Sequence, residues 1–120
     1  MAKGIAAGPA KIPWACEVLF YYILDEDGEA VPVIDVIEWA RWLDGNPDRM
    51  QVDDTWLGKV RVSTVFFGLN RQWGEGPPLL FETMVFGGLY DLRQWRWTTR
   101  IQAQAGHDRI VAAIRDGQEP

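Results

Sequence analysis

This 120-residue chain contains only one cysteine, Cys16, and one histidine, His107. A single cysteine excludes an intramolecular disulfide and is typical of a protein from a reducing compartment. One cysteine and one histidine also cannot supply the four ligands of a zinc site built from protein alone. We therefore expect neither a bound metal nor another cofactor.

Long apolar runs are absent as well. No stretch approaches the roughly 18 residues that a transmembrane helix needs. The N-terminal residues include Lys3 and Lys11 but no continuous apolar core, which argues against a signal peptide. These features predict a cytoplasmic protein that does not associate with membranes. Residues 1–16, rich in alanine, glycine and proline, are expected to form a flexible tail.

Basic residues are scarce in one part of the chain. Residues 17–54 carry eleven acidic side chains and only two arginines, while the whole chain has a net charge of −5. Such a segment repels nucleic acid and attracts cationic protein surfaces. The alternative is an acidic surface that only keeps the protein soluble. The first interpretation predicts no direct nucleic-acid binding. It places partner-binding residues in the two densest acidic groups, Asp25, Asp27 and Glu29, and Asp53 and Asp54.

The segment DEDGE, residues 25–29, resembles the beginning of a calcium-binding loop, with Asp25, Asp27 and Gly28 in place. An EF-hand also requires a bidentate glutamate at loop position twelve, and that position is occupied by Val36. Asp27-Gly28 is instead typical of a tight hairpin turn. We therefore expect a turn between two strands here, without a metal ion.

Strand-forming sequence is abundant, with β-branched and aromatic residues that alternate with polar ones. Asp35 and Thr99 predict the first residues of two helices. The sequence predicts one α+β domain, residues 17–116, with a frayed end at 117–120. Its antiparallel sheet of four to six strands, in the order β-β-α-β-β-β-β-α, carries two helices packed on one face. The expected strands are Val18–Leu24, Ala30–Ile34, Gln51–Trp56, Val60–Phe67, Leu80–Phe86 and Arg93–Thr98, and the expected helices are Val36–Asp44 and Ile101–Arg115.

The predicted centre of the sheet is the pair Val60–Phe67 and Leu80–Phe86. Alternation along the second strand places Glu82 among apolar neighbours on the same face. A carboxylate in such surroundings needs a cation, so we predict an ion pair with Arg96 or Arg61 on a neighbouring strand. The alternative is a functional carboxylate.

His107 lies on the apolar stripe of the second expected helix, which favours a half-buried packing residue. A catalytic role would need a nucleophile or an orienting carboxylate beside it. The corresponding alternative function is a small hydrolase or transferase that uses His107 with a carboxylate such as Glu82.

The last expected strand, Arg93–Thr98, directs Trp95 and Trp97 to one face and Arg96 to the other. This pattern fits an outer strand with inward tryptophans. It also fits an arginine–aromatic surface that binds nucleic acid. The negative net charge favours the outer strand.

The nine-residue loop Asn70–Pro78 joins two strands that a two-residue turn could join, and long connections are frequently functional. Its Trp73 either folds over the sheet and closes the end of the core, or is an exposed anchor that enters a pocket on a partner. Because Glu75 lies beside it in the sequence, the predicted partner-binding residues include both Trp73 and Glu75.

Two runs, VSTVFFGLN and GPPLLFETMVFGG, resemble a family of small proteins found in phage, prophage and bacterial genomes. Members carry V-S-T-V-F-L-G-L-D-H, a glycine-rich loop and P-L-L-F-E-T-M-V-F-G-G. The similarity extends more weakly over residues 21–111, through YYILDEDGEAVPV, EWARW and AGHDRIV. The chain departs from the family at Asn70-Arg71, where the pattern has Asp-His, and this counts against an enzyme.

The resemblance implies no established activity, but a phage distribution implies an accessory protein. Small acidic phage proteins without a catalytic motif often bind a host protein, and inhibitors of bacterial defence such as anti-CRISPR proteins are one such group. The expected function is a non-enzymatic protein that binds and inhibits a host protein complex. A hydrolase or transferase, and a phage structural or assembly component, are the alternatives.

Overall fold

The computed structural model describes residues 20–72 and 75–120. The expected tail of residues 1–16, the first residues of the first expected strand and Trp73 lie outside these ranges. Within them the chain forms six strands and three helices. In chain order these are β1 (Tyr21–Leu24), β2 (Ala30–Val33), α1 (Val36–Gly45), α2 (Pro47–Met50), β3 (Gln51–Leu57), β4 (Val60–Phe66), β5 (Phe81–Phe86), β6 (Gln94–Trp97) and α3 (Arg100–Arg115).

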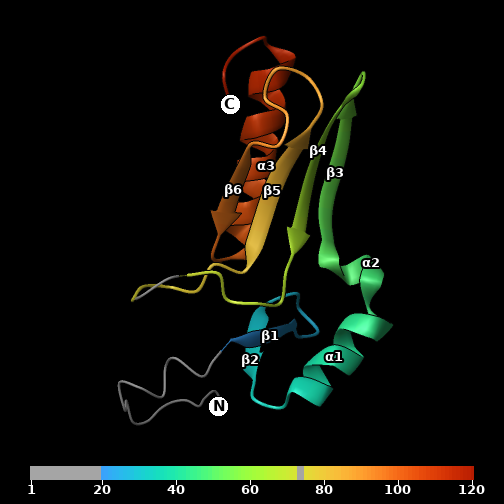
Figure 1. Ribbon diagram of the computed structural model, residues 1–120, viewed down its shortest axis with the longest axis vertical. Coiled ribbons are helices and arrows are strands. Elements are labelled where there is room, and N and C mark those ends of the chain that lie inside the picture. Colours follow the sequence, from blue (N-terminus) through green and yellow to red (C-terminus); the bar gives the residue numbers. More distant parts are fainter. Residues whose placement is uncertain (1–19, 73–74) are drawn as a thin grey trace.

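The strands form two antiparallel sheets (Figure 1). β3, β4, β5 and β6 make a four-stranded sheet in sequence order, and α3 runs along one face of it. β1 and β2 make a separate hairpin that packs with α1 near the end of the larger sheet where β4 ends (Figure 1). The predicted α+β class and antiparallel strands are confirmed, and α2 is an additional one-turn helix that begins at Pro47.

Two sheets form in place of the single expected sheet because the chain turns sharply at Gly68, after the end of β4. The φ of Gly68 is +76°, a conformation that residues with a side chain rarely adopt. Residues beyond the end of β4 then pair with β1 and with the residue just before it: Tyr22 N donates to Gly68 O at 2.8 Å, and Asn70 N donates to Phe20 O at 2.9 Å. The free edge of β1 is thereby joined to this connection, and α1 packs on the hairpin instead of beside α3.

The main core lies between α3 and one face of the larger sheet. Side chains alternate along β4 and β5 as the sequence predicts, so that every second residue is buried against the helix. Gly106 of α3 lies directly against the ring of Trp97 in β6. The residues that fill this interface are Val62, Thr64, Phe66, Phe81, Thr83, Val85, Ala103, His107 and Ile110, none of which is more than 1% exposed.

Both long helices begin at the predicted capping residues. The carboxylate of Asp35 accepts a hydrogen bond from Ile37 N at 2.8 Å, and Thr99 forms a capping box with Gln102 at the start of α3. These side chains satisfy backbone N–H groups that have no partner within the helix. Among the helices of the described ranges, none has the length and apolar character needed to cross a bilayer.

Tryptophans attach the hairpin and α1 to the larger sheet. Trp39 donates its indole N–H to Gly68 O at 2.9 Å, and Trp42 packs edge-on against Phe66 with ring centroids 6.0 Å apart. We call residues 20–50, which comprise β1, β2, α1 and α2, the hairpin lobe. This lobe lies at the end of the molecule away from the C-terminus (Figure 1).

Candidate functional site

The face of the larger sheet that points away from α3 carries a row of three large side chains. Trp56 of β3 pairs with Arg61 of β4, and Arg61 pairs with Phe86 of β5. Because their strand neighbours face α3, alternation places all three side chains on the opposite face. We call Trp56, Arg61 and Phe86 the open-face row.

The guanidinium of Arg61 is fixed between the two rings of the row. It lies 5.9 Å from the ring centroid of Trp56 and 5.9 Å from that of Phe86, within cation–π range of both. Asp54 holds it in a bidentate arrangement, with N–O distances of 2.7 and 3.1 Å. These hydrogen bonds to Asp54 raise the pKa of Arg61. The indole of Trp56 nevertheless remains 62% exposed and Phe86 39% exposed.

The other charges on the open face are also paired. Glu82 of β5 lies opposite Arg96 of β6, and the Arg96 Nε donates to the Glu82 carboxylate at 3.2 Å. This confirms one of the two ion pairs that the sequence predicts for Glu82. Both arginines of the open face, Arg61 and Arg96, therefore have a carboxylate partner. The face presents aromatic surface with little uncompensated charge.

The predicted acidic residues of the hairpin lobe lie in and beside the turn between β1 and β2. Asp25 stabilises its own turn, since its carboxylate accepts from Asp27 N and Glu29 N, each at 2.9 Å. The side chains of Asp27 and Glu29 are exposed and have no hydrogen bond or ion pair with any described residue. Two of the three predicted carboxylates here are therefore free to meet a partner, whereas Asp25 has a structural role.

The acidic segment of the sequence also forms a separate region of the structure. The hairpin lobe, residues 20–50, carries eight acidic and two basic side chains, a net charge of −6. Residues 51–120 carry eight of each and are neutral overall. Because the lobe lies at one end of the molecule (Figure 1), the protein has one strongly acidic end.

Asp53 and Asp54 are neighbours on β3, but their side chains lie on opposite faces of the sheet. Asp54 holds Arg61 on the open face. Asp53 turns toward α3, where its Oδ2 accepts from Gln104 Nε2 at 2.7 Å and lies 3.6 Å from His107 Nε2. The structure therefore separates these two predicted site residues and places neither in the hairpin lobe.

His107 is 1% exposed and has a partner at each ring nitrogen. Its Nε2 lies 2.9 Å from Thr55 Oγ1, and its Nδ1 lies 2.8 Å from Thr64 Oγ1. Thr64 Oγ1 lies 2.6 Å from Thr83 Oγ1, which in turn accepts from Trp97 Nε1 at 3.0 Å. Four strands and one helix thus contribute to a continuous buried polar network, which we call the histidine network.

The indole of Trp97 sets a direction for the histidine network, because an indole nitrogen can only donate. A head-to-tail chain then has Thr83 donating to Thr64, and Thr64 donating to Nδ1 of His107. We therefore assign the ring proton to Nε2, on the side of the Asp53 carboxylate. In this arrangement every member of the chain is satisfied, as a buried polar group requires.

The histidine network does not form a catalytic site with Glu82. Glu82 lies on the open face with Arg96, while His107 lies between the sheet and α3. The structure therefore does not bring together the two residues of the predicted hydrolase or transferase. Within the described ranges, no three side chains of the metal-ligating types are grouped closely enough to hold a metal ion.

The hydrogen bonds of Asp53 lead us to predict that the free energy of unfolding changes at acidic pH. The hydrogen bond from Gln104 lowers the pKa of Asp53 below its ordinary value of 3.8. Burial opposes this shift, whereas the N–H of Asp54 and the nearby His107 reinforce it. Because the pKa of Asp53 is lower in the folded protein than in the unfolded chain, its carboxylate stabilises the fold at pH values above the unfolded-state pKa. This contribution is lost as the pH falls through the pKa that Asp53 has in the folded protein.

The free energy of unfolding should therefore fall below about pH 4 more steeply in the wild type than in Asp53→Asn. Urea titrations at a series of pH values would measure this difference. Gln104→Leu removes the main donor and should reduce the steepness of the wild-type curve. Parallel curves for wild type and Asp53→Asn would contradict the assignment.

The predicted loop anchor lies partly outside the described residues. Trp73 is not described, so its role stays a prediction, and Glu75 is exposed. Asn70 stabilises the two ends of the loop, since its Oδ1 accepts from Gln72 N at 2.8 Å and from Leu79 N at 3.2 Å.

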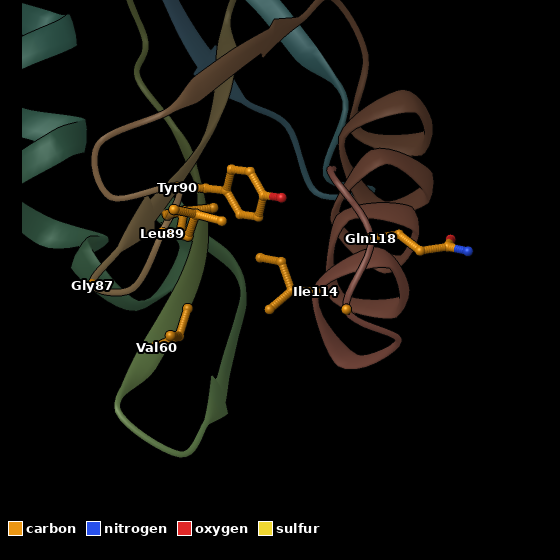
Figure 2. A pocket seen from close by; sticks show the side chains of 8 residues that line it. Val60, Gly87, Leu89, Tyr90, Ile114 and Gln118 are labelled. Atoms are coloured by element: carbon orange, nitrogen blue, oxygen red, sulfur yellow. The ribbon is translucent and has the colours of Figure 1, made fainter.

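An apolar pocket of about 230 Å³ opens where the core reaches the far end of the sheet. Figure 2 shows Tyr90 and Leu89 of the β5–β6 loop on one side and Ile114 of α3 on the other, with the Gln118 side chain directed away. Its lining provides no carboxylate, histidine or thiol. This pocket offers contact area and no acid–base chemistry.

The sequence alone does not predict the open-face row. Asp54, the carboxylate that holds Arg61, is among the predicted partner-binding residues, but only because of its negative charge. Comparison with known proteins does not assign the site either: no family model matches the chain, and no curated protein or solved structure shows significant similarity to it.

Proposed function

We propose that this protein is a non-catalytic binding module that docks on a partner protein through the open-face row. The observation that carries the proposal is the exposure of Trp56 and Phe86 on either side of an arginine that Asp54 already holds in place. Tryptophan and arginine are the residue types most enriched among binding hot spots. Asp54 already orients the Arg61 side chain before binding, so less conformational entropy is lost when a partner covers it.

A partner with a basic surface fits this protein best. The hairpin lobe carries a net charge of −6, while the arginines of the open face are neutralised by Asp54 and Glu82. Charge of this kind accelerates encounter with a cationic protein, and aromatic anchors then determine how long the complex lasts. Asp27 and Glu29 would serve the first step, and Trp56 and Phe86 the second.

The biological role that we propose is inhibition of a host protein complex in the bacterial cytoplasm. The resemblance to phage and prophage proteins supports this role, and so does an acidic end that could occupy a basic groove of a nucleic-acid-handling complex. An anti-CRISPR-like inhibitor of bacterial defence is the specific form of this proposal. Co-purification with virions would instead favour a structural or assembly component.

Single-stranded nucleic acid is the second candidate, because exposed aromatic side chains on a sheet are surfaces on which bases stack. Such binding also needs a positively charged groove along the backbone. Arg61 and Arg96 are both paired with carboxylates, and the hairpin lobe is acidic. We therefore expect no change in the anisotropy of a labelled single-stranded oligonucleotide at physiological salt.

Capture from a bacterial host lysate, followed by binding measurements with the captured protein, tests the proposal. Trp56→Ala should weaken the complex by about 30-fold or more, because loss of a hot-spot side chain costs ~2 kcal/mol or more. Phe86→Ala should act in the same direction. The matched control is Ile101→Ala on α3, since Ile101 is 78% exposed but remote from the open face.

The hairpin lobe is tested separately by reversing charge at Asp27 and Glu29. The association rate should fall and its salt dependence should weaken, while the dissociation rate stays close to that of the wild type. A captured partner whose affinity is unchanged by Trp56→Ala and Phe86→Ala would reject the open-face row as the binding surface.

A further inference from the structure

A polar pocket of about 280 Å³ lies where the hairpin lobe meets the larger sheet. Its walls come from the β1–β2 turn, from α2 with the first residue of β3, and from the first residue of α3, with buried Leu24 also in the lining. The size is at the lower limit of small-molecule sites, which suits a metabolite of a few heavy atoms. The pocket shares no residue with the open-face row.

Charged side chains of both signs line this pocket without pairing with each other. Glu26, Asp27 and Asp48 supply three carboxylates, and Arg49 and Arg100 supply two guanidiniums. In the described part of the chain none of the five forms an ion pair. Arg49 donates instead to the carbonyl oxygen of Asp25 and lies over the ring of Trp42 at 5.5 Å. Opposite charges therefore surround one space without pairing with each other, and of these side chains Arg100 is half-buried while the other four are exposed.

Arg100 occupies an unfavourable position for a cation. It is the first residue of α3, where the helix dipole places partial positive charge, and the first turn of α3 contains no acidic residue. Its side chain is directed toward the β1–β2 turn, because a Cβ at Gly28 would lie 3.5 Å from its Cδ and 3.9 Å from its Nη1. An anion in the pocket would compensate both the guanidinium and the helix terminus.

We propose that this pocket binds a small zwitterion of the α-amino-acid class. The carboxylate of the ligand bonds to Arg100, and its ammonium group faces Glu26, Asp27 and Asp48. A zwitterion uses both signs of charge, whereas a simple anion would leave the three carboxylates uncompensated and a simple cation would leave the guanidiniums uncompensated. The carboxylates do not form a metal site, since they are not grouped closely enough within the described residues.

Nuclear magnetic resonance with the ¹⁵N-labelled full chain tests this proposal, with L-glutamine as the probe. The backbone amides of Gly28 and Arg100 should shift saturably on titration to ~20 mM, a range that covers the millimolar affinity of a small ligand with a few charged contacts. Sodium acetate and ethylammonium chloride, each carrying one of the two charges, should bind at least about tenfold more weakly.

Arg100→Gln should weaken L-glutamine binding by about tenfold or more, because a charge-assisted hydrogen bond is lost. Arg115→Gln is the matched control in the last turn of the same helix and should leave the affinity unchanged. Acetate that binds as tightly as L-glutamine would identify an anion site, and ethylammonium that does so would identify a cation site. Either outcome, or the absence of saturable shifts in the folded wild type, overturns the proposal. Binding through the open-face row would stand in all three cases.

Discussion

Gly106→Ala is expected to destabilise the fold by about 3 kcal/mol or more. A Cβ at this position would lie 2.2 Å from Cζ2 and 2.4 Å from Cη2 of Trp97, far inside van der Waals contact. The indole cannot easily retreat, because its Nε1 donates to Thr83 and its strand pairs with β5. Overpacking of a rigid core typically costs about 1–3 kcal/mol and occasionally more, and an overlap this deep belongs at or beyond the upper end of that range, which is a large share of the ~5–15 kcal/mol that stabilises a small domain.

Thermal denaturation followed by circular dichroism would measure the effect of Gly106→Ala. Gly45→Ala at the end of α1 is the matched control, because no atom lies within 4 Å of its would-be Cβ. This control should melt at the wild-type temperature or slightly above it, since alanine favours the helix. A Gly106→Ala variant that melts cooperatively within a few degrees of wild type would show that α3 and β6 pack differently.

His107→Ala should lower the free energy of unfolding by about 3–5 kcal/mol. The change leaves a cavity between α3 and the larger sheet. It also removes the partner of two hydroxyl groups, Thr55 at 2.9 Å and Thr64 at 2.8 Å. Thr64 is fully buried, so water cannot easily replace the lost hydrogen bond.

Urea denaturation would quantify the loss in His107→Ala. Asp108→Ala, at the adjacent exposed position of α3, is the control and should change stability by no more than about 0.5 kcal/mol. If His107→Ala cost no more than this control, the histidine network would contribute nothing measurable to the fold.

The local features of the fold could be predicted from sequence because each depends on residues close together in the chain. Alternation identified the buried face of β4 and β5, and capping residues located the first turns of α1 and α3. Alternation also limited the partners of Glu82 to arginines on neighbouring strands, and Arg96 is the one that pairs. Each of these predictions follows from the two-residue period of a strand or from the capping pattern of a helix, and none requires knowing how the strands are aligned with each other.

The open-face row could not be predicted in this way because it depends on register. Trp56, Arg61 and Phe86 lie up to 30 positions apart and meet only through the pairing of β3, β4 and β5. A slip of one residue in either ladder would move one member of the row to the other face. Among seven tryptophans, nothing local distinguishes the exposed Trp56 from those that pack in the core.

The histidine network and the division into two sheets escaped prediction for related reasons. A lone histidine on a helix stripe indicates burial, but its two hydroxyl partners come from two different strands, and a third strand supplies the next hydroxyl of the network. The division into two sheets depends on Gly68, where a positive φ redirects the chain to β1. A glycine after a strand signals a turn but does not specify which strand the chain pairs with next.

The footprint of the captured partner tests the central claim most directly. Hydrogen–deuterium exchange of the complex, compared with that of the free protein, would report which surface the partner covers. We predict slower exchange along β3 and in the β3–β4 turn, at the exposed edge of the sheet next to Trp56, with a smaller effect at the β1–β2 turn. Protection confined to α3 or to the β5–β6 loop, with β3 and its turn unchanged, would contradict the open-face row as the binding surface.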